Sequence, residues 1–106
     1  MNEAEFEKLA DAVLAQVEVS LERCGLDLDL ELKEGGVLEV GFASGAKLIV
    51  NRHRVAREIW VAAPSGGFHF RWDGTSWRDT RSGGELFEAL SKLVSEQGGD
   101  AVRLQP

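Results

Sequence analysis

Apolar residues near the N-terminus recur every three or four positions, which is the spacing of one buried helix face. Asn2, followed three positions later by Glu5, has the pattern of a capping box that satisfies the first free amides of a helix. The pattern predicts a helix over residues 3–23, ended by Gly25. Its buried face is formed by Phe6, Leu9, Ala10, Val13, Val17 and Leu21.

The period then changes to two, as in strands that bury one face. Four leucines between Leu26 and Leu32 alternate with charged residues, and we expect the leucines to point inward. Glycine-containing turns separate the later alternating runs, which is typical of antiparallel hairpins. The predicted strands cover residues 26–33, 37–42, 47–51, 58–63, 68–72 and 76–78, with a polar loop at 52–57.

A second amphipathic helix is predicted after the strands. Ser82 and Glu85 form another capping-box pattern, an apolar face runs from Leu86 to Val94, and the helix ends near Gly98. Because helices and strands are segregated along the chain, the fold class is α+β. We expect a two-layer α-β sandwich, with both helices on one face of an antiparallel sheet. A chain of 106 residues fits a single domain over residues 1–106.

Composition excludes several classes of protein. With 43% hydrophobic and 28% charged residues the chain is typical of a globular protein. The single cysteine, Cys24, excludes an internal disulfide framework and a metal site built from several thiolates. No run of 18 apolar residues is present, and no basic region precedes an apolar run at the N-terminus. We therefore expect a cytoplasmic protein without membrane contact, and a monomer is the simplest oligomeric state.

Charge is unevenly distributed along the chain. Residues 1–39 carry a net charge of −8, residues 40–81 carry +4 and residues 82–106 carry −2, which together give −6. An acidic majority disfavours nucleic-acid binding and favours cations or a basic protein as partners. The basic cluster in the predicted loop at 52–57 has three interpretations. Its side chains could contact phosphate, provide the counter-charge for the acidic ridge of a neighbouring molecule, or simply be solvated.

The acidic residues of the first helix lie close together around its axis. Four of them fall within an arc of about 60° at 100° per residue. The following strand adds acidic side chains on one face, so that both rows could merge into one acidic ridge. Carboxylates attract hard cations such as Fe²⁺ and Fe³⁺, with weak binding at an exposed site. The alternative is a solvated helix face. The acidic residues concerned are Glu7, Asp11, Glu18 and Glu22 of the helix and Asp27, Asp29 and Glu31 of the strand.

Trp60 is the second informative residue. Its neighbours Ile59 and Val61 are the more apolar pair, and Glu58 shares the side of the strand on which Trp60 lies. This favours an outward Trp60, in the region shared by Lys47, Asn51, His69 and Arg71. An exposed indole beside basic groups is a candidate protein-binding hot spot. The alternative orientation buries Trp60 in the core.

Short segments over nearly the whole chain follow the order of a known family. They are Glu5-Phe6, Leu9-Ala10-Asp11, Gly36-Val37-Leu38 with Phe42, Asn51-Arg52, Ile59-Trp60-Val61-Ala62, Gly66-Gly67-Phe68-His69-Phe70, Trp77 and Arg81-Ser82-Gly83. In this order they resemble the frataxin family, most specifically over residues 51–67. The resemblance implies the same sandwich and a cytoplasmic iron-binding protein that acts in iron–sulfur cluster assembly.

The resemblance also implies roles for particular residues. Weakly bound Fe²⁺ or Fe³⁺ would be held by Glu7, Asp11, Glu18, Glu22, Asp27 and Asp29. The partners would be a cysteine desulfurase and its scaffold protein, and Trp60 and Asn51 would contact a partner, with His69 and Arg71 beside them. Arg23 departs from the acidic pattern and would lower the affinity for cations. The resulting hypothesis is a regulator without chemistry of its own.

Two alternatives differ from this hypothesis. The first is a ferroxidase and iron-storage activity. It is disfavoured because the chain has no Glu-x-x-His pair of the kind that fixes di-iron sites. The second is an interaction module that needs no metal.

Overall fold

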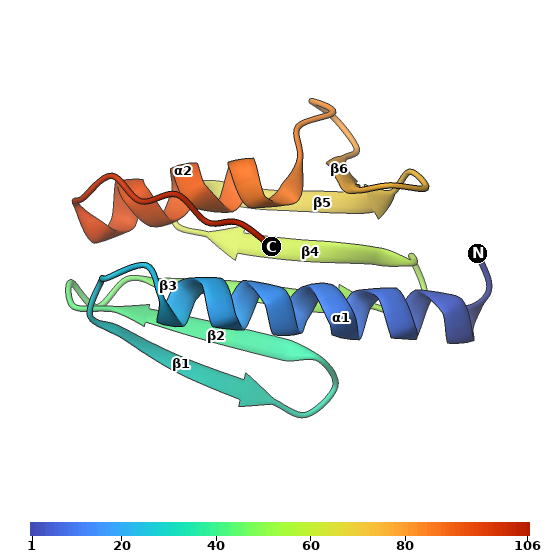
Figure 1. The fold of residues 1–106 in the computed structure, drawn as a ribbon, viewed down its shortest axis with the longest axis horizontal. Helices are drawn as coiled ribbons and strands as arrows, with labels where there is room; N and C mark the ends of the chain where they lie inside the picture. Colours follow the sequence, from blue (N-terminus) through green and yellow to red (C-terminus); the bar gives the residue numbers. More distant parts are fainter.

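A computed structural model describes residues 1–106 as two helices and six strands (Figure 1). The elements are α1 (Glu3–Glu22), β1 (Leu28–Lys33), β2 (Val37–Phe42), β3 (Lys47–His53), β4 (Glu58–Ala63), β5 (Gly66–Trp72), β6 (Trp77–Asp79) and α2 (Leu86–Gly98). The strands form one antiparallel sheet in the order β1-β2-β3-β4-β5-β6. Both helices cover the same face of this sheet (Figure 1), which confirms the predicted α-β sandwich. Neither helix combines the length and the apolar character needed to cross a bilayer.

The core lies between the helix layer and the sheet. Alternate residues of β2, β3 and β4 point toward the helices and are buried, as period-two patterning predicts. Phe6 of α1 and Phe70 of β5 are fully buried. The Phe6 ring meets the Trp77 ring edge to face, with centroids 6.1 Å apart. Because Trp77 belongs to β6, this contact joins the first helix to the last strand.

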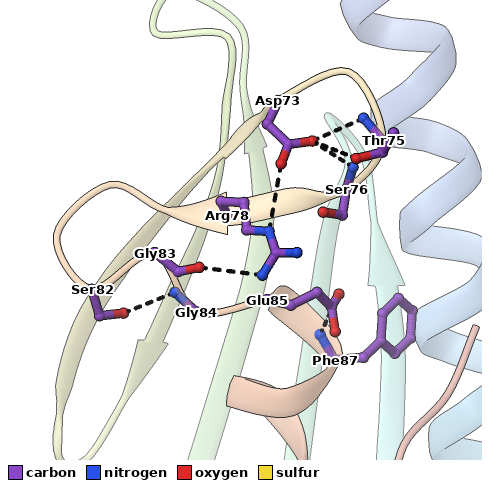
Figure 2. A network of polar contacts seen from close by, with 9 residues as sticks. All are labelled: Asp73, Thr75, Ser76, Arg78, Ser82, Gly83, Gly84, Glu85 and Phe87. Atoms are coloured by element: carbon purple, nitrogen blue, oxygen red, sulfur yellow. Dashed lines mark hydrogen bonds and ion pairs between the residues drawn. The ribbon is translucent and has the colours of Figure 1, made fainter.

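The two helix starts differ from each other. At α1 the predicted capping box is present, with the Asn2 side chain accepting from the Glu5 amide at 2.8 Å. At α2 the predicted box of Ser82 and Glu85 is wrong. Glu85 is itself the N-cap, and its carboxylate accepts from the amides of Phe87 and Glu88. The Ser82 hydroxyl accepts instead from the Gly84 amide at 3.2 Å, within the loop before the helix (Figure 2).

The turn between β5 and β6 is held by the Asp73 carboxylate. It accepts from the amides of Ser76 and Thr75, both at 2.8 Å, and these donors lower the pKa of Asp73 to about 2. Arg78 bridges this turn to the loop before α2, with its Nε 3.5 Å from Asp73 Oδ2 and an N–H donated to the Gly83 carbonyl (Figure 2). The predicted Asp-Gly hairpin is thereby tied to the start of α2.

Strand β3 is longer than predicted. Arg52 pairs with Ile59 and His53 pairs with Glu58, so the first two residues of the predicted loop at 52–57 belong to the sheet. The polar composition of this segment suggested a loop, but pairing with β4 gives its backbone partners. Because side chains alternate along a strand, Arg52 lies on the helix face and His53 on the outer face.

The leucines of the edge strand β1 are only partly buried. The strand begins at Leu28, two residues later than predicted, and Leu28 and Leu30 pack against the core. Leu32 is 58% exposed, so its predicted inward burial is wrong. Figure 1 shows that β1, the edge strand, diverges from α1 toward its C-terminal end.

Candidate functional site

Trp60 lies on the outer face of the sheet. Its neighbours Ile59 and Val61 are 0% and 2% exposed and point to the helices, so the outward orientation of Trp60 is confirmed. The register places Trp60 between Asn51 of β3 and His69 of β5. Of the predicted outer-face neighbours, Asn51 and His69 therefore lie beside Trp60, whereas Lys47 is paired with Glu39 of β2.

Two histidine rings cover the indole of Trp60. The His53 ring stacks on it with centroids 3.7 Å apart and an interplanar angle of 16°. The His69 ring stacks with centroids 4.3 Å apart and an angle of 7°. Since β3 and β5 flank β4, the two imidazoles lie on opposite faces of the indole. We call these three residues the histidine–tryptophan stack.

Glu58 lies buried beneath this stack. It is the only charged residue among the buried ones, with 6% of its surface exposed. Its Oε1 accepts from the Trp60 indole N–H at 2.8 Å, and its Oε2 accepts from Arg71 at 2.7 Å. The His69 Nδ1 lies 3.6 Å from Oε1. A buried carboxylate needs such partners, and here they fix the orientation of the indole.

Three acidic residues in the first half of α1 are paired with arginines of β3 and its turn. Arg52 forms an ion pair with Asp11, and the Arg54 Nε lies 3.0 Å from a Glu7 oxygen. Gly36 makes the first pair possible, since a Cβ at this position would lie 2.6 Å from the Arg52 side chain. Two predicted iron ligands, Glu7 and Asp11, therefore already have counter-ions within the chain.

The remaining predicted iron ligands form no ion pair with the rest of the chain. They come from two neighbouring elements, α1 and β1. Glu18 and Glu22 lie in the helix layer, whereas the register of β1 puts Asp29 on the outer face of the sheet, with Asp27 just before the strand. The acidic edge is thus formed by Glu18 and Glu22 of α1 together with Asp27 and Asp29 at the start of β1. Nowhere do three His, Cys, Asp or Glu side chains come close enough together to hold a metal ion.

An ion-paired patch on β2 lies between the acidic edge (Glu18, Glu22, Asp27 and Asp29) and the histidine–tryptophan stack. Glu39 of β2 accepts from Lys33 and Lys47, each at 2.8 Å. These two hydrogen bonds lower the pKa of Glu39 to about 2, and the Glu39 carboxylate raises the pKa of Lys33. On the outer face, Asp29 at the edge of the sheet is therefore separated from the histidine–tryptophan stack by Glu39 and its two lysines.

Comparison with known proteins identifies the family. A sequence model of the frataxin-like domain matches residues 1–100. This chain belongs to the frataxin family. The iron–sulfur cluster assembly protein CyaY of Dechloromonas aromatica is 58% identical to this frataxin over 105 residues, covering 99% of this chain and all of the relative. The protein of the same name from Janthinobacterium is 53% identical over 109 residues, covering 99% and 97%.

Solved frataxin structures share the fold. The frataxin of Psychromonas ingrahamii is 32% identical to this chain, with a TM-score of 0.90 over the whole of both chains. A ferrous complex of trimeric yeast frataxin has a TM-score of 0.59 at 23% identity and covers 94% of this chain and 88% of the yeast chain. The similarity to the yeast structure concerns the fold alone.

Sequence reasoning missed two residues of the outer face in this frataxin. The polar composition of residues 52–57 predicts a loop at His53, although His53 continues the alternation of Lys47, Ile49 and Asn51 by one more step. The sequence shows only that Glu58 shares a strand face with Trp60, whereas its burial depends on three partners from two strands. The alternation could have revealed the first, but no local signal reveals the second.

Proposed function

We propose that this frataxin is an iron-binding adaptor that regulates iron–sulfur cluster assembly in the cytoplasm. It docks onto the complex of a cysteine desulfurase and its scaffold protein and has no chemistry of its own. The observation that carries the docking is the outer face, where a buried carboxylate holds the half-buried Trp60 in one orientation. Preorganised tryptophans at protein surfaces are typical interface hot spots. Close relatives named as assembly proteins support the assembly role.

The acidic edge supplies the electrostatic part of this docking. Glu18, Glu22, Asp27 and Asp29 have no counter-ion in the chain, so their charge is available to a basic patch on the desulfurase. Summed charge of one sign accelerates association and orients the encounter. The paired Glu7 and Asp11 contribute less, because Arg54 and Arg52 neutralise them.

The same carboxylates are the proposed iron ligands. Oxygen donors suit Fe²⁺ and Fe³⁺, and a site without a fixed cage binds them weakly and exchanges them readily. Bound iron would reduce the negative charge of the edge and so change the affinity for a basic partner. Iron occupancy and docking would then be coupled.

Replacing Trp60 by alanine tests the docking face. We expect the affinity for the desulfurase–scaffold complex to fall about 30-fold, since hot-spot truncation costs about 2 kcal/mol or more. Isothermal titration calorimetry measures the loss. The control is Val55→Ala, which removes an apolar side chain that is 87% exposed in the turn before β4. Equal affinities for wild type and Trp60→Ala would contradict the proposal.

Titration with Fe²⁺ under anaerobic conditions, or with Co²⁺, tests the metal role by NMR. We expect signal changes around Glu18, Glu22, Asp27 and Asp29 and smaller ones around the ion-paired Asp11. The matched variant Arg52→Ala/Arg54→Ala frees the acids of the first half of α1 and should extend the changes into it. An absence of changes would favour the metal-free module. In a separate aerobic assay with Fe²⁺, oxygen uptake above the buffer rate would favour the ferroxidase.

A further inference from the structure

We infer that the hollow between α1 and the edge strand β1 receives one basic side chain of the docking partner, with its aliphatic stem against Leu32 and its charge at Glu18. This inference rests on the proposed docking function and adds a defined contact to the acidic edge. The partner would then bind through one inserted side chain as well as through summed charge.

The hollow is small and partly apolar. Its volume is about 260 Å³. Pockets for small molecules usually measure about 300–1,000 Å³, so this hollow has the size for a side chain rather than for an organic cofactor. Its apolar lining consists of Leu14 and Ala15 of α1 and Leu32 of β1, and Leu32 is 58% exposed. An aliphatic stem placed on these residues removes apolar surface from water on both partners.

The charged residues of the lining are paired within the chain, with one exception. Arg52 forms an ion pair with Asp11, and Lys33 directs its Nζ to Glu39 at 2.8 Å. The exception is Glu18, which is half-buried and forms no ion pair. A partly buried carboxylate without a counter-ion favours a cation beside it.

The lysines near the hollow do not compensate Glu18, because other acids balance them. Glu39 accepts from both Lys33 and Lys47. The hydrogen bond to Glu39 and the charge of the nearby Glu31 raise the pKa of Lys33. Two acids thus face two lysines. An acidic occupant of the hollow would meet the Glu18 carboxylate, and a wholly apolar occupant would leave it unpaired. The long stem and terminal charge of an arginine or lysine satisfy both parts of the lining.

A pair of substitutions at Leu32 tests the charge of the occupant. We expect Leu32→Lys to weaken binding of the desulfurase–scaffold complex at least about 10-fold, since it repels a basic side chain. Leu32→Glu loses the apolar contact but attracts the same side chain, so its loss should stay below about 3-fold. Isothermal titration calorimetry at one salt concentration measures both. Equal losses would indicate an apolar occupant and the reverse order an acidic one, and either result would overturn the inference.

The matched controls place the same charges at Val19. This residue is 43% exposed in α1 and does not line the hollow. Val19→Lys and Val19→Glu should differ in affinity by less than about 3-fold, because only the summed charge changes there. A difference as large as that at Leu32 would overturn the inference. Should a Leu32 variant unfold, Leu32→Thr is measured instead; we expect a loss of about 5-fold from the missing apolar contact, and wild-type affinity would be decisive against it.

Two further measurements separate this inference from the docking proposal and from self-association. If Trp60→Ala weakens binding and Leu32→Lys does not, the docking function stands and the hollow is not part of it. If neither weakens binding, both fail. Sedimentation of the protein alone is expected to be the same for wild type and Leu32→Lys. Self-association that Leu32→Lys abolishes would mean that a second copy fills the hollow, and would overturn the inference.

Discussion

Replacing Phe6 by alanine is expected to lower the free energy of unfolding by about 3–5 kcal/mol. The Phe6 ring is fully buried, and its edge-to-face contact with Trp77 connects α1 to the last strand. Truncation loses the transfer energy of the ring and leaves a cavity where two layers meet. For a domain whose total stability is about 5–15 kcal/mol, this is a large fraction. Equilibrium unfolding in urea, followed by circular dichroism, measures the change.

Val19→Ala is the matched control for this substitution. Val19 lies in the same helix but is 43% exposed, so its truncation should change the free energy of unfolding by about 0.5 kcal/mol or less. A loss below about 1 kcal/mol for Phe6→Ala would mean that the core between α1 and β6 rearranges to fill the space.

Reversing the charge of the acidic edge is expected to have the largest effect on docking. The variant Glu18→Lys/Glu22→Lys/Asp27→Lys changes three groups that have no counter-ion in the chain, so it turns attraction toward a basic partner into repulsion. We expect affinity for the desulfurase–scaffold complex to fall at least about 100-fold at low salt. The loss should shrink at about 1 M salt, where the Debye length is about 3 Å. Surface plasmon resonance at both salt concentrations measures it.

The control carries the same change of net charge elsewhere. Glu88→Lys/Glu96→Lys/Asp100→Lys alters exposed acids in α2 and just after it, none of which belongs to the acidic edge. It should reduce affinity by a much smaller factor. Equal losses in both variants would show that only the total charge matters and would remove the acidic edge from the docking surface.

The fold could be predicted from sequence because its signals are local. The three-to-four spacing around Phe6 and Val13, the alternation through β2 and β4, and the glycine turns each act within one element, and the structure agrees with them. The errors lie where tertiary contacts outweigh local preference. Leu32 alternates as a buried residue should, but it lies on the edge strand β1 and is 58% exposed.

The candidate site could be predicted only in part, because its parts are joined across strands. The outward direction of Trp60 followed from the polarity of its neighbours. The histidine stack required knowing that β3 continues to His53, and the pairing of Asp11 with Arg52 joins residues 41 positions apart. Such contacts depend on register and on the placement of α1, which no short-range pattern contains.

The ends of the sheet bear on how this frataxin associates with other proteins. An open sheet leaves unpaired backbone groups on its outermost strands, where a second chain could add a strand. Here β6 has only three residues, and the outer face of β1 carries the charged side chains of Asp29, Glu31 and Lys33. Short edge strands and charged side chains at the sheet edges discourage backbone pairing with a second chain and amyloid-like growth. Recognition of a partner is therefore left to side chains on the broad face and the acidic edge.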